Sequence, residues 1–170
     1  MNSRTFFTLI IISLALIGGC SAPTFTTEME PSGTKIIKGT FERSDISEDP
    51  LFPWYKSNYD TYQLDSSVIN ELKPLMNDIR FVVVVGTWCG DSKRELPHTF
   101  KIMDALSVSE DDVHLFGVDR SKKSTDGTTE RYTISRVPTL IVLRGDEELG
   151  RIVESPRSTQ EKDLLRILQK

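Results

Sequence analysis

Apolar positions along the chain fall into short runs that predict strands. The runs at 81–85 and 113–118 show no regular polar alternation, which is typical of interior strands covered on both faces. A third run at 139–143 is followed by a turn at Gly145 and by a shorter run at 149–153. This pattern predicts a hairpin whose second strand lies at a sheet edge.

Apolar residues at helical spacing predict two longer helices, over 66–79 and 91–107. Each of them contains a proline. A proline inside a helix removes a backbone hydrogen bond, so Pro74 is expected to kink or end the first helix and Pro97 to bend the second.

Capping residues mark further helix starts. Asp65 or Ser66 is expected to cap the helix over 66–79. Ser158 with Glu161 has the spacing of a capping box and predicts a last helix, and a short helix is expected over 128–132.

The predicted elements follow one another as helix, strand, helix, strand, short helix, strand, strand and helix. Strands that alternate with helices and end in a hairpin indicate an α/β sandwich. The fold class expected is therefore a central mixed β-sheet with helices on both faces.

The first nineteen residues look like a targeting segment rather than part of the fold. Arg4 precedes an apolar run over 6–17, which is shorter than the roughly 17–25 residues that span a bilayer. The run leads into Gly18-Gly19-Cys20, which resembles the bacterial lipobox. This resemblance implies a lipid on Cys20, with the mature protein anchored in the cell envelope and facing the periplasm.

Two alternatives remain open for this segment: an ordinary signal peptide with an incidental cysteine, and an uncleaved anchor. Ser21, rather than an aspartate, follows Cys20. In a host with two membranes, that residue favours sorting to the outer membrane.

The chain divides into four expected parts. Residues 1–19 form the signal peptide, 20–33 a polar tether, 34–63 an N-terminal extension packed on the domain, and 64–170 the domain itself. The extension begins with an expected strand at 35–41. Its aromatic-rich part over 51–62 is read as irregular and packed on the domain, the alternative being a surface that docks a partner.

Composition excludes several classes of function. The 170 residues carry a formal net charge of −4 and no basic patch, which argues against a nucleic-acid partner. His98 and His114 do not have metal-ligand spacing, and there is no phosphate-binding loop. We therefore expect neither a metal nor another cofactor.

The cysteine count directs attention to one thiol. If Cys20 is acylated, Cys89 is the only free thiol of the mature chain. Cys89 ends an apolar strand and opens a helix, a position where helix N–H groups favour the thiolate. Lys93 and Arg94 add positive charge nearby, and Ser92 lies one helical turn on, where its hydroxyl is expected to bond the sulfur.

Several motifs resemble the thioredoxin family at the right separations, over roughly 64–170. Trp88-Cys89-Gly90-Asp91-Ser92 matches the family's Trp-Cys-Gly-x-Cys motif except for the second cysteine. Pro97 matches the proline that bends the family's active-site helix, and Pro138 matches its cis-proline. The envelope anchor resembles the membrane-tethered bacterial branch of thioredoxin-like proteins.

The resemblance implies the roles of several residues. Cys89 is the expected nucleophile and Ser92 its partner in the site, whereas a second thiol is missing. The residues expected to contact a substrate are Trp88, Gly90, Asp91, Arg136, Val137 and Pro138. A cis Pro138 leaves the Val137 backbone available to pair with an extended substrate. A second departure is Val83, which stands where thioredoxins carry a buried acid.

The expected function is thiol–disulfide exchange through one cysteine that forms mixed disulfides with envelope proteins containing a disulfide or a thiol. One alternative is a binding module that keeps the fold but has no catalytic turnover, which Ser92 and Val83 both favour. A further alternative is a monothiol glutaredoxin-like protein, because Cys89-Gly90-Asp91-Ser92 shares that spacing.

Overall fold

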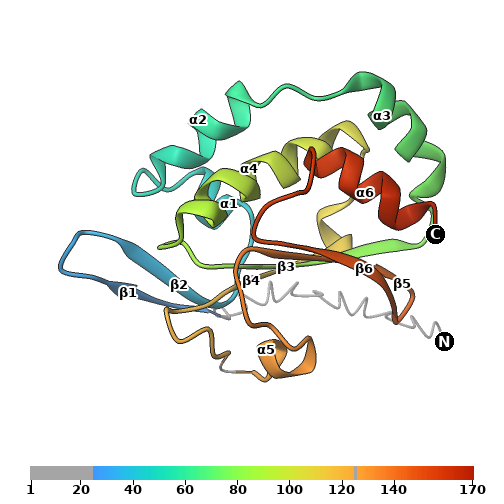
Figure 1. Cartoon of the computed structure of the whole chain (residues 1–170). Coiled ribbons are helices and arrows are strands. Elements are labelled where there is room, and N and C mark those ends of the chain that lie inside the picture. The colour runs from blue at the N-terminus through green and yellow to red at the C-terminus, as the bar shows by residue number, and fades with distance from the viewer. Residues whose placement is uncertain (1–24, 125) are drawn as a thin grey trace, which may run out of the picture.

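A six-stranded mixed sheet runs through the protein, in the order β1-β2-β4-β3-β5-β6 (Figure 1). The computed structural model describes residues 25–124 and 126–170, so the predicted signal peptide and Cys20 lie outside the described residues. Strands β3 and β4 run parallel, and the other neighbours are antiparallel. The strands are β1 (Phe25–Met29), β2 (Lys35–Thr40), β3 (Ile79–Val85), β4 (Val113–Gly117), β5 (Thr139–Arg144) and β6 (Glu147–Val153).

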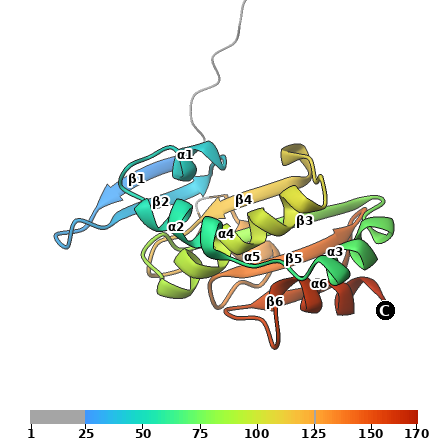
Figure 2. The same ribbon diagram turned by 90° about the horizontal axis from the view of Figure 1, so that it is seen from above.

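Helices cover both faces of this sheet, as expected. Figures 1 and 2 show α2, α3, α4 and α6 on one face, and Figure 1 shows α5 on the other. Among the described residues, no helix is both long and apolar enough to cross a membrane. The helices are α1 (Ser44–Ser47), α2 (Pro53–Thr61), α3 (Ser66–Leu72), α4 (Gly90–Ala105), α5 (Thr128–Arg131) and α6 (Gln160–Leu168), with short 3-10 turns at Lys73–Leu75 and Glu110–Asp112.

The central strand β3 explains the two-sided core. Successive side chains of a strand point to opposite faces. Phe81, Val83 and Val85 belong to the cluster under α4, whereas Val82 and Val84 belong to the cluster on the other face. The uninterrupted apolar run is thus confirmed as an interior strand.

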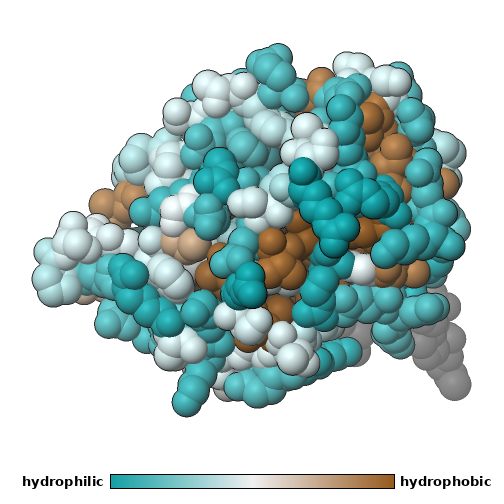
Figure 3. Space-filling view, in the orientation of Figure 1, coloured by the Kyte–Doolittle hydropathy of each residue, from teal (hydrophilic) through white to brown (hydrophobic). Residues whose placement is uncertain are grey.

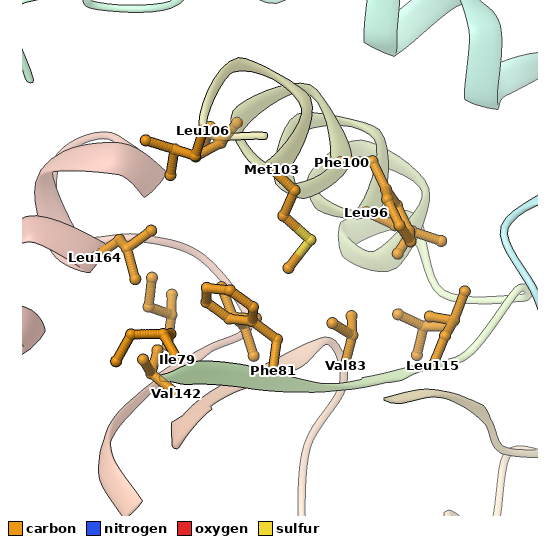
Figure 4. Packing of buried hydrophobic residues seen from close by; sticks show 14 of the residues in the cluster. Ile79, Phe81, Val83, Leu96, Phe100, Met103, Leu106, Leu115, Val142 and Leu164 are labelled. Carbon is orange, nitrogen blue, oxygen red and sulfur yellow. The ribbon is translucent and has the colours of Figure 1, made fainter. Parts of the chain in front are cut away.

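Helix α4 lies over this strand and is held there by its apolar side. Figure 4 shows Leu96, Phe100 and Met103 of α4 facing Phe81 and Val83 of β3. Each of these side chains is almost fully buried, and burying one stabilises the fold by about 1.5–3 kcal/mol. The face of the molecule in Figure 3 is mainly hydrophilic, with hydrophobic patches between the polar side chains.

The structure contradicts the polar tether expected over 20–33. From Phe25 onward this stretch forms β1, which pairs antiparallel with β2 through a turn in which Gly33 has φ +82°. We call β1, β2 and their turn, residues 25–40, the N-terminal hairpin. Strand β1 lies at the sheet edge with its last four residues exposed, so it carries no alternating apolar pattern that would reveal it.

The segment over 51–62 is not irregular as expected, because most of it is helix α2. Pro53 occupies the first turn of α2, where its missing N–H costs no hydrogen bond. Tyr55 is buried, and it packs beside Phe100 of α4 with ring centroids 6.4 Å apart. The expectation that this segment packs on the domain is confirmed.

The two ends of α3 agree with their sequence signals. Asp65 caps α3 by accepting hydrogen bonds from the backbone N–H groups of Ser67 and Val68. Helix α3 ends at Leu72, and Pro74 sits in the 3-10 turn that follows. Pro74 therefore ends the helix, which is one of the two outcomes expected.

The predicted capping box at the last helix is wrong. Thr159, not Ser158, caps α6. Glu161 is fully buried and accepts hydrogen bonds from the Tyr62 hydroxyl at 2.6 Å and from the Asp65 N–H at 3.1 Å. Its carboxylate therefore joins α6 to the segment before α3.

Candidate active site at Cys89

Cys89 lies at the junction between β3 and α4, as the sequence predicts. It is the N-cap residue of α4, with φ −85° and ψ 129°. Its N–H donates to the Gly86 carbonyl at 2.8 Å, and its carbonyl accepts from the Lys93 N–H at 3.0 Å. The half-buried thiol is therefore held at the positive end of the helix dipole.

The loop before β5 comes close to this thiol. The Cys89 thiol donates to the carbonyl oxygen of Val137, with Sγ and O 3.4 Å apart. The Val137–Pro138 peptide bond is cis, which confirms the expectation for Pro138. Residues 48 positions apart in sequence thus form one site.

Ser92 has a structural partner in this site. Its side chain is buried, and its hydroxyl oxygen accepts the backbone N–H of Gly86 at 3.2 Å. No hydrogen bond between Ser92 and the Cys89 sulfur occurs within the described part of the chain. The expected contact with the sulfur is thus replaced by one that holds the β3–α4 loop.

Trp88 forms a wall next to Cys89. Its indole N–H donates to the Val118 carbonyl at 3.0 Å, and both Trp88 and Cys89 pack against the apolar cluster on the α5 face. A Cβ on Gly86 would lie 2.7 Å from the indole ring. Gly86 therefore has to be glycine for the indole to lie where it does.

The charged groups around the site are largely paired. Asp91 accepts a hydrogen bond from Arg94 at 2.8 Å, and Arg94 also bonds the buried Glu95 at 2.7 Å. Arg136 is exposed and pairs with Glu154 at 2.9 Å. Two of the positive charges expected near the thiol, Arg94 and Arg136, are thus balanced by carboxylates.

Gly90 occupies open space at the start of α4. It is exposed, and a Cβ added there would meet no atom within 4 Å. The backbone beside Cys89 is therefore open to an incoming molecule.

A buried acid lies close to the position where Val83 replaces one. Val83 packs in the apolar core, whereas Glu95 of α4 lines a small cavity together with Val83 and Pro138. The sequence does not reveal this carboxylate, because a glutamate in the first turns of a helix is ordinarily exposed. Within the described residues, no cluster of His, Cys, Asp and Glu side chains offers a metal site.

Two contacts from the N-terminal hairpin also escape sequence reasoning. The Thr87 hydroxyl donates to the Lys35 carbonyl at 2.8 Å and accepts from the Ile37 N–H at 3.3 Å. Arg120 lies over the Trp88 ring and is bound by Glu30. These partners lie far apart in sequence, so no local pattern points to them.

Comparison with solved structures finds several that are similar to this one. The structure is similar to a protein of unknown function, PA1234 from Pseudomonas aeruginosa, with a TM-score of 0.56 and 16% identity over 76% of this chain and 92% of that one. It is also similar to thioredoxin O2 from Arabidopsis thaliana (TM-score 0.39, 17% identity, 61% and 83% covered). Mitochondrial thioredoxin 3 from Saccharomyces cerevisiae has a TM-score of 0.39 and 20% identity, with 66% and 97% covered.

No curated protein matches the chain. A family model described as thioredoxin, however, matches residues 54–166, which is more than half of the sequence. The matched part begins at α2, within the segment that the sequence pattern assigns to the extension. On this match, with the mixed sheet, the cysteine at the strand-to-helix junction and the adjacent cis-proline, the chain belongs to the thioredoxin family.

Proposed function

We propose that this protein is a thiol–disulfide oxidoreductase of the cell envelope that acts through Cys89 alone. The observation that carries the proposal is the contact of the Cys89 thiol with the Val137 carbonyl at 3.4 Å. This contact puts a half-buried, helix-capping thiol beside Pro138. A disulfide brought to this loop would meet the sulfur directly.

The chemical step is thiol–disulfide exchange. The Cys89 thiolate attacks one sulfur of a partner's disulfide, so a new S–S bond forms while the partner's S–S bond breaks. The second partner sulfur leaves as a thiolate and takes a proton from solvent. No electrons are gained or lost overall, because one disulfide replaces another.

Release of the mixed disulfide needs a thiol that this chain does not supply. Ser92 occupies the position one turn after Cys89, and its hydroxyl is engaged by the Gly86 N–H. Release therefore falls to a second thiol of the partner or to a thiol from outside. This requirement favours disulfide isomerisation, transfer or capture over net reduction.

The backbone of Val137 offers a docking edge for an extended partner segment. Its N–H has no hydrogen-bond partner among the residues that the structure describes, and its own carbonyl accepts the hydrogen bond from the Cys89 thiol. An extended segment can pair with such a backbone group as an added strand does. Trp88 and the open backbone at Gly90 then flank the partner's disulfide.

The proposed anchor limits the distance between the membrane and the start of the sheet. Strand β1 begins at Phe25, five residues after Cys20. A fully extended chain of that length spans about 17 Å. With lipid on Cys20, the domain would stay close to the bilayer and would meet partners near its surface.

The direct test expresses the full chain and its Cys89→Ser variant in the native envelope and compares mixed disulfides on non-reducing gels. Discrete adducts that disappear in the variant support the proposal and reveal the partners. Identical lanes contradict it.

A second candidate is a binding module without turnover. It is favoured by the apolar Val83 and by the structural role of Ser92. This candidate predicts partners that bind equally well to the wild type and to the Cys89→Ser variant. Co-purification with both proteins under reducing conditions would distinguish it.

A further inference from the structure

Arg120 covers the aromatic residue that precedes the reactive cysteine. Its guanidinium carbon lies 4.9 Å from the centre of the Trp88 ring. The indole N–H is bonded to Val118, two residues before Arg120. Trp88 is therefore held at its edge by a carbonyl and on its face by a cation.

Glu30 holds that guanidinium in place. Its two carboxylate oxygens accept from Arg120 Nε at 2.6 Å and from an Arg120 terminal nitrogen at 3.0 Å. This two-point geometry orients a planar guanidinium. The hydrogen bond from Arg120 holds the pKa of Glu30 below its ordinary value, so the carboxylate is charged at neutral pH.

Glu30 itself is fixed by the turn of the N-terminal hairpin. Its N–H donates to the Thr34 carbonyl and its carbonyl accepts from the Gly33 N–H, both at 2.9 Å. Figure 1 shows this turn and the start of α4 at the same end of the sheet, at the left of the view. The Thr87 contacts with β2 provide a second link between the hairpin and the loop that carries Cys89.

The hairpin lies outside residues 54–166, which match the family model. The series of contacts from Glu30 through Arg120 to Trp88 therefore begins in a segment that precedes the matched domain. It connects the part of the protein nearest to Cys20 with the residue next to Cys89.

We propose that Arg120 and Glu30 are positioning residues for the exchange reaction of Cys89. Arg120, oriented by Glu30, keeps the Trp88 indole against Val118 and so keeps one wall of the partner's docking site in place. This inference rests on the proposed function, since the wall matters only if a partner disulfide approaches Cys89. Without the clamp, the indole moves more freely, and a docking partner has to order it first.

A positioning role and a purely electrostatic role predict different changes in the reaction rate for two matched variants. Glu30→Gln removes a negative charge near the site, and Arg120→Gln removes a positive one. If the pair acted through charge on the thiolate, the two substitutions would change the rate in opposite directions. If the pair acts by holding Trp88, both slow the reaction.

The test uses the full chain in a Trp54→Phe background, in which Trp88 is the only tryptophan. Two quantities are measured: quenching of Trp88 fluorescence by acrylamide, and the rate at which Cys89 forms a mixed disulfide with a disulfide-bonded peptide. Alkylation by iodoacetamide, which needs no docking wall, serves as the reference reaction. Glu28→Gln is the matched control, because Glu28 pairs with Lys38 on the same hairpin and does not contact Trp88.

Glu30→Gln and Arg120→Gln are each expected to raise quenching and to slow the peptide reaction by about twofold to fivefold, with the alkylation rate unchanged. The double variant is expected to resemble either single variant, since both remove the same clamp. Glu28→Gln is expected to match the wild type. Thermal unfolding of each variant shows whether the fold is kept.

Three results would overturn the inference. In the first, Glu30→Gln behaves like Glu28→Gln in quenching and in the peptide reaction. In the second, the two variants change the rate in opposite directions, which assigns the pair an electrostatic role. In the third, a wild type that forms no mixed disulfide with the peptide refutes the proposed function, and unchanged quenching in the variants then also refutes the clamp on Trp88.

Discussion

At the scale of single residues, the site depends on two positions that carry no reactive group. Gly86 leaves the space that the Trp88 indole fills, and its N–H binds the Ser92 hydroxyl. Ser92 is buried, and its hydroxyl binds the β3–α4 loop rather than the Cys89 sulfur. The chemistry of Cys89 therefore rests on a close-packed turn.

Substitution of Gly86 by alanine tests that packing. The added methyl would lie 2.7 Å from the indole, so Gly86→Ala is expected to destabilise the fold by about 1–3 kcal/mol. Gly90→Ala is the matched control, because its methyl enters open space. Denaturant unfolding of both variants measures the difference, and equal stabilities would show that the indole does not depend on Gly86.

The missing second thiol can be restored at Ser92. In Ser92→Cys, the introduced thiol is one helical turn from Cys89 and attacks its sulfur, which forms an internal disulfide and releases the partner as a thiol. The lifetime of the mixed disulfide is expected to fall by about tenfold or more, because the attack is intramolecular. The measurement is the decay of a purified peptide adduct. A lifetime equal to that of the wild type would contradict the assigned role of this position.

At the scale of elements, the N-terminus of α6 joins three segments through one buried carboxylate. Glu161 accepts from Tyr62, which follows α2, and from the N–H of Asp65, which caps α3. Burial acts to raise the pKa of Glu161, but the hydrogen bonds from Tyr62 and the backbone outweigh it and leave the pKa below its ordinary value of 4.5. Burial and the bond to Glu161 raise the pKa of Tyr62.

The stability of this junction should depend on pH in the acid range. A carboxyl group with a lowered folded-state pKa stabilises the fold above its unfolded pKa, and that contribution is lost as pH falls through the folded value. Glu161→Gln is expected to cost about 1–3 kcal/mol at neutral pH and progressively less below pH 4.5. Unfolding by urea at a series of pH values measures this, and a difference that does not change with pH would contradict it.

Elements that bury an apolar face were predictable from the sequence, and those without one were not. Strand β3 and helix α4 have strong patterns because both pack in the core. Strand β1 has none because it is an exposed edge. Helix α2 was not expected, because the segment over 51–62 was interpreted as irregular, although its Pro53 is well suited to a first turn.

The candidate site divides in the same way. The motif around Cys89 and the proline at Pro138 were predicted, and the structure brings them together. Glu30 and Arg120 were missed because 90 positions separate them. A contact of that kind follows from strand order in the folded sheet, which local periodicity does not encode.

At the scale of the whole molecule, the N-terminal hairpin connects the proposed anchor with the candidate site. It adds β1 and β2 to the sheet next to β4, and Glu30 at its turn binds Arg120. The proposed lipid at Cys20 would thus attach only five residues before the sheet begins. If the proposed anchor is present, the hairpin that follows it is also the segment that contacts the loop carrying Cys89.

The anchor itself is testable by fractionation. If Cys20 carries lipid, the wild-type chain is expected in the membrane fraction, and Cys20→Ser is expected to lose lipid labelling and the size shift of the processed form. Cys89→Ser is the control, because it removes the other cysteine and should stay in the membrane fraction. Lipid labelling that persists in Cys20→Ser would contradict the anchor.

Covalent exchange by Cys89 can be measured by mixing the reduced full chain with a peptide disulfide and following the intact mass over time. We expect an added mass equal to one peptide thiol less two hydrogens, located on Cys89, removed by an external thiol and absent in Cys89→Ser. A chain that gains no mass from the peptide, although its Cys89 remains free and the protein is folded, would contradict the proposed function.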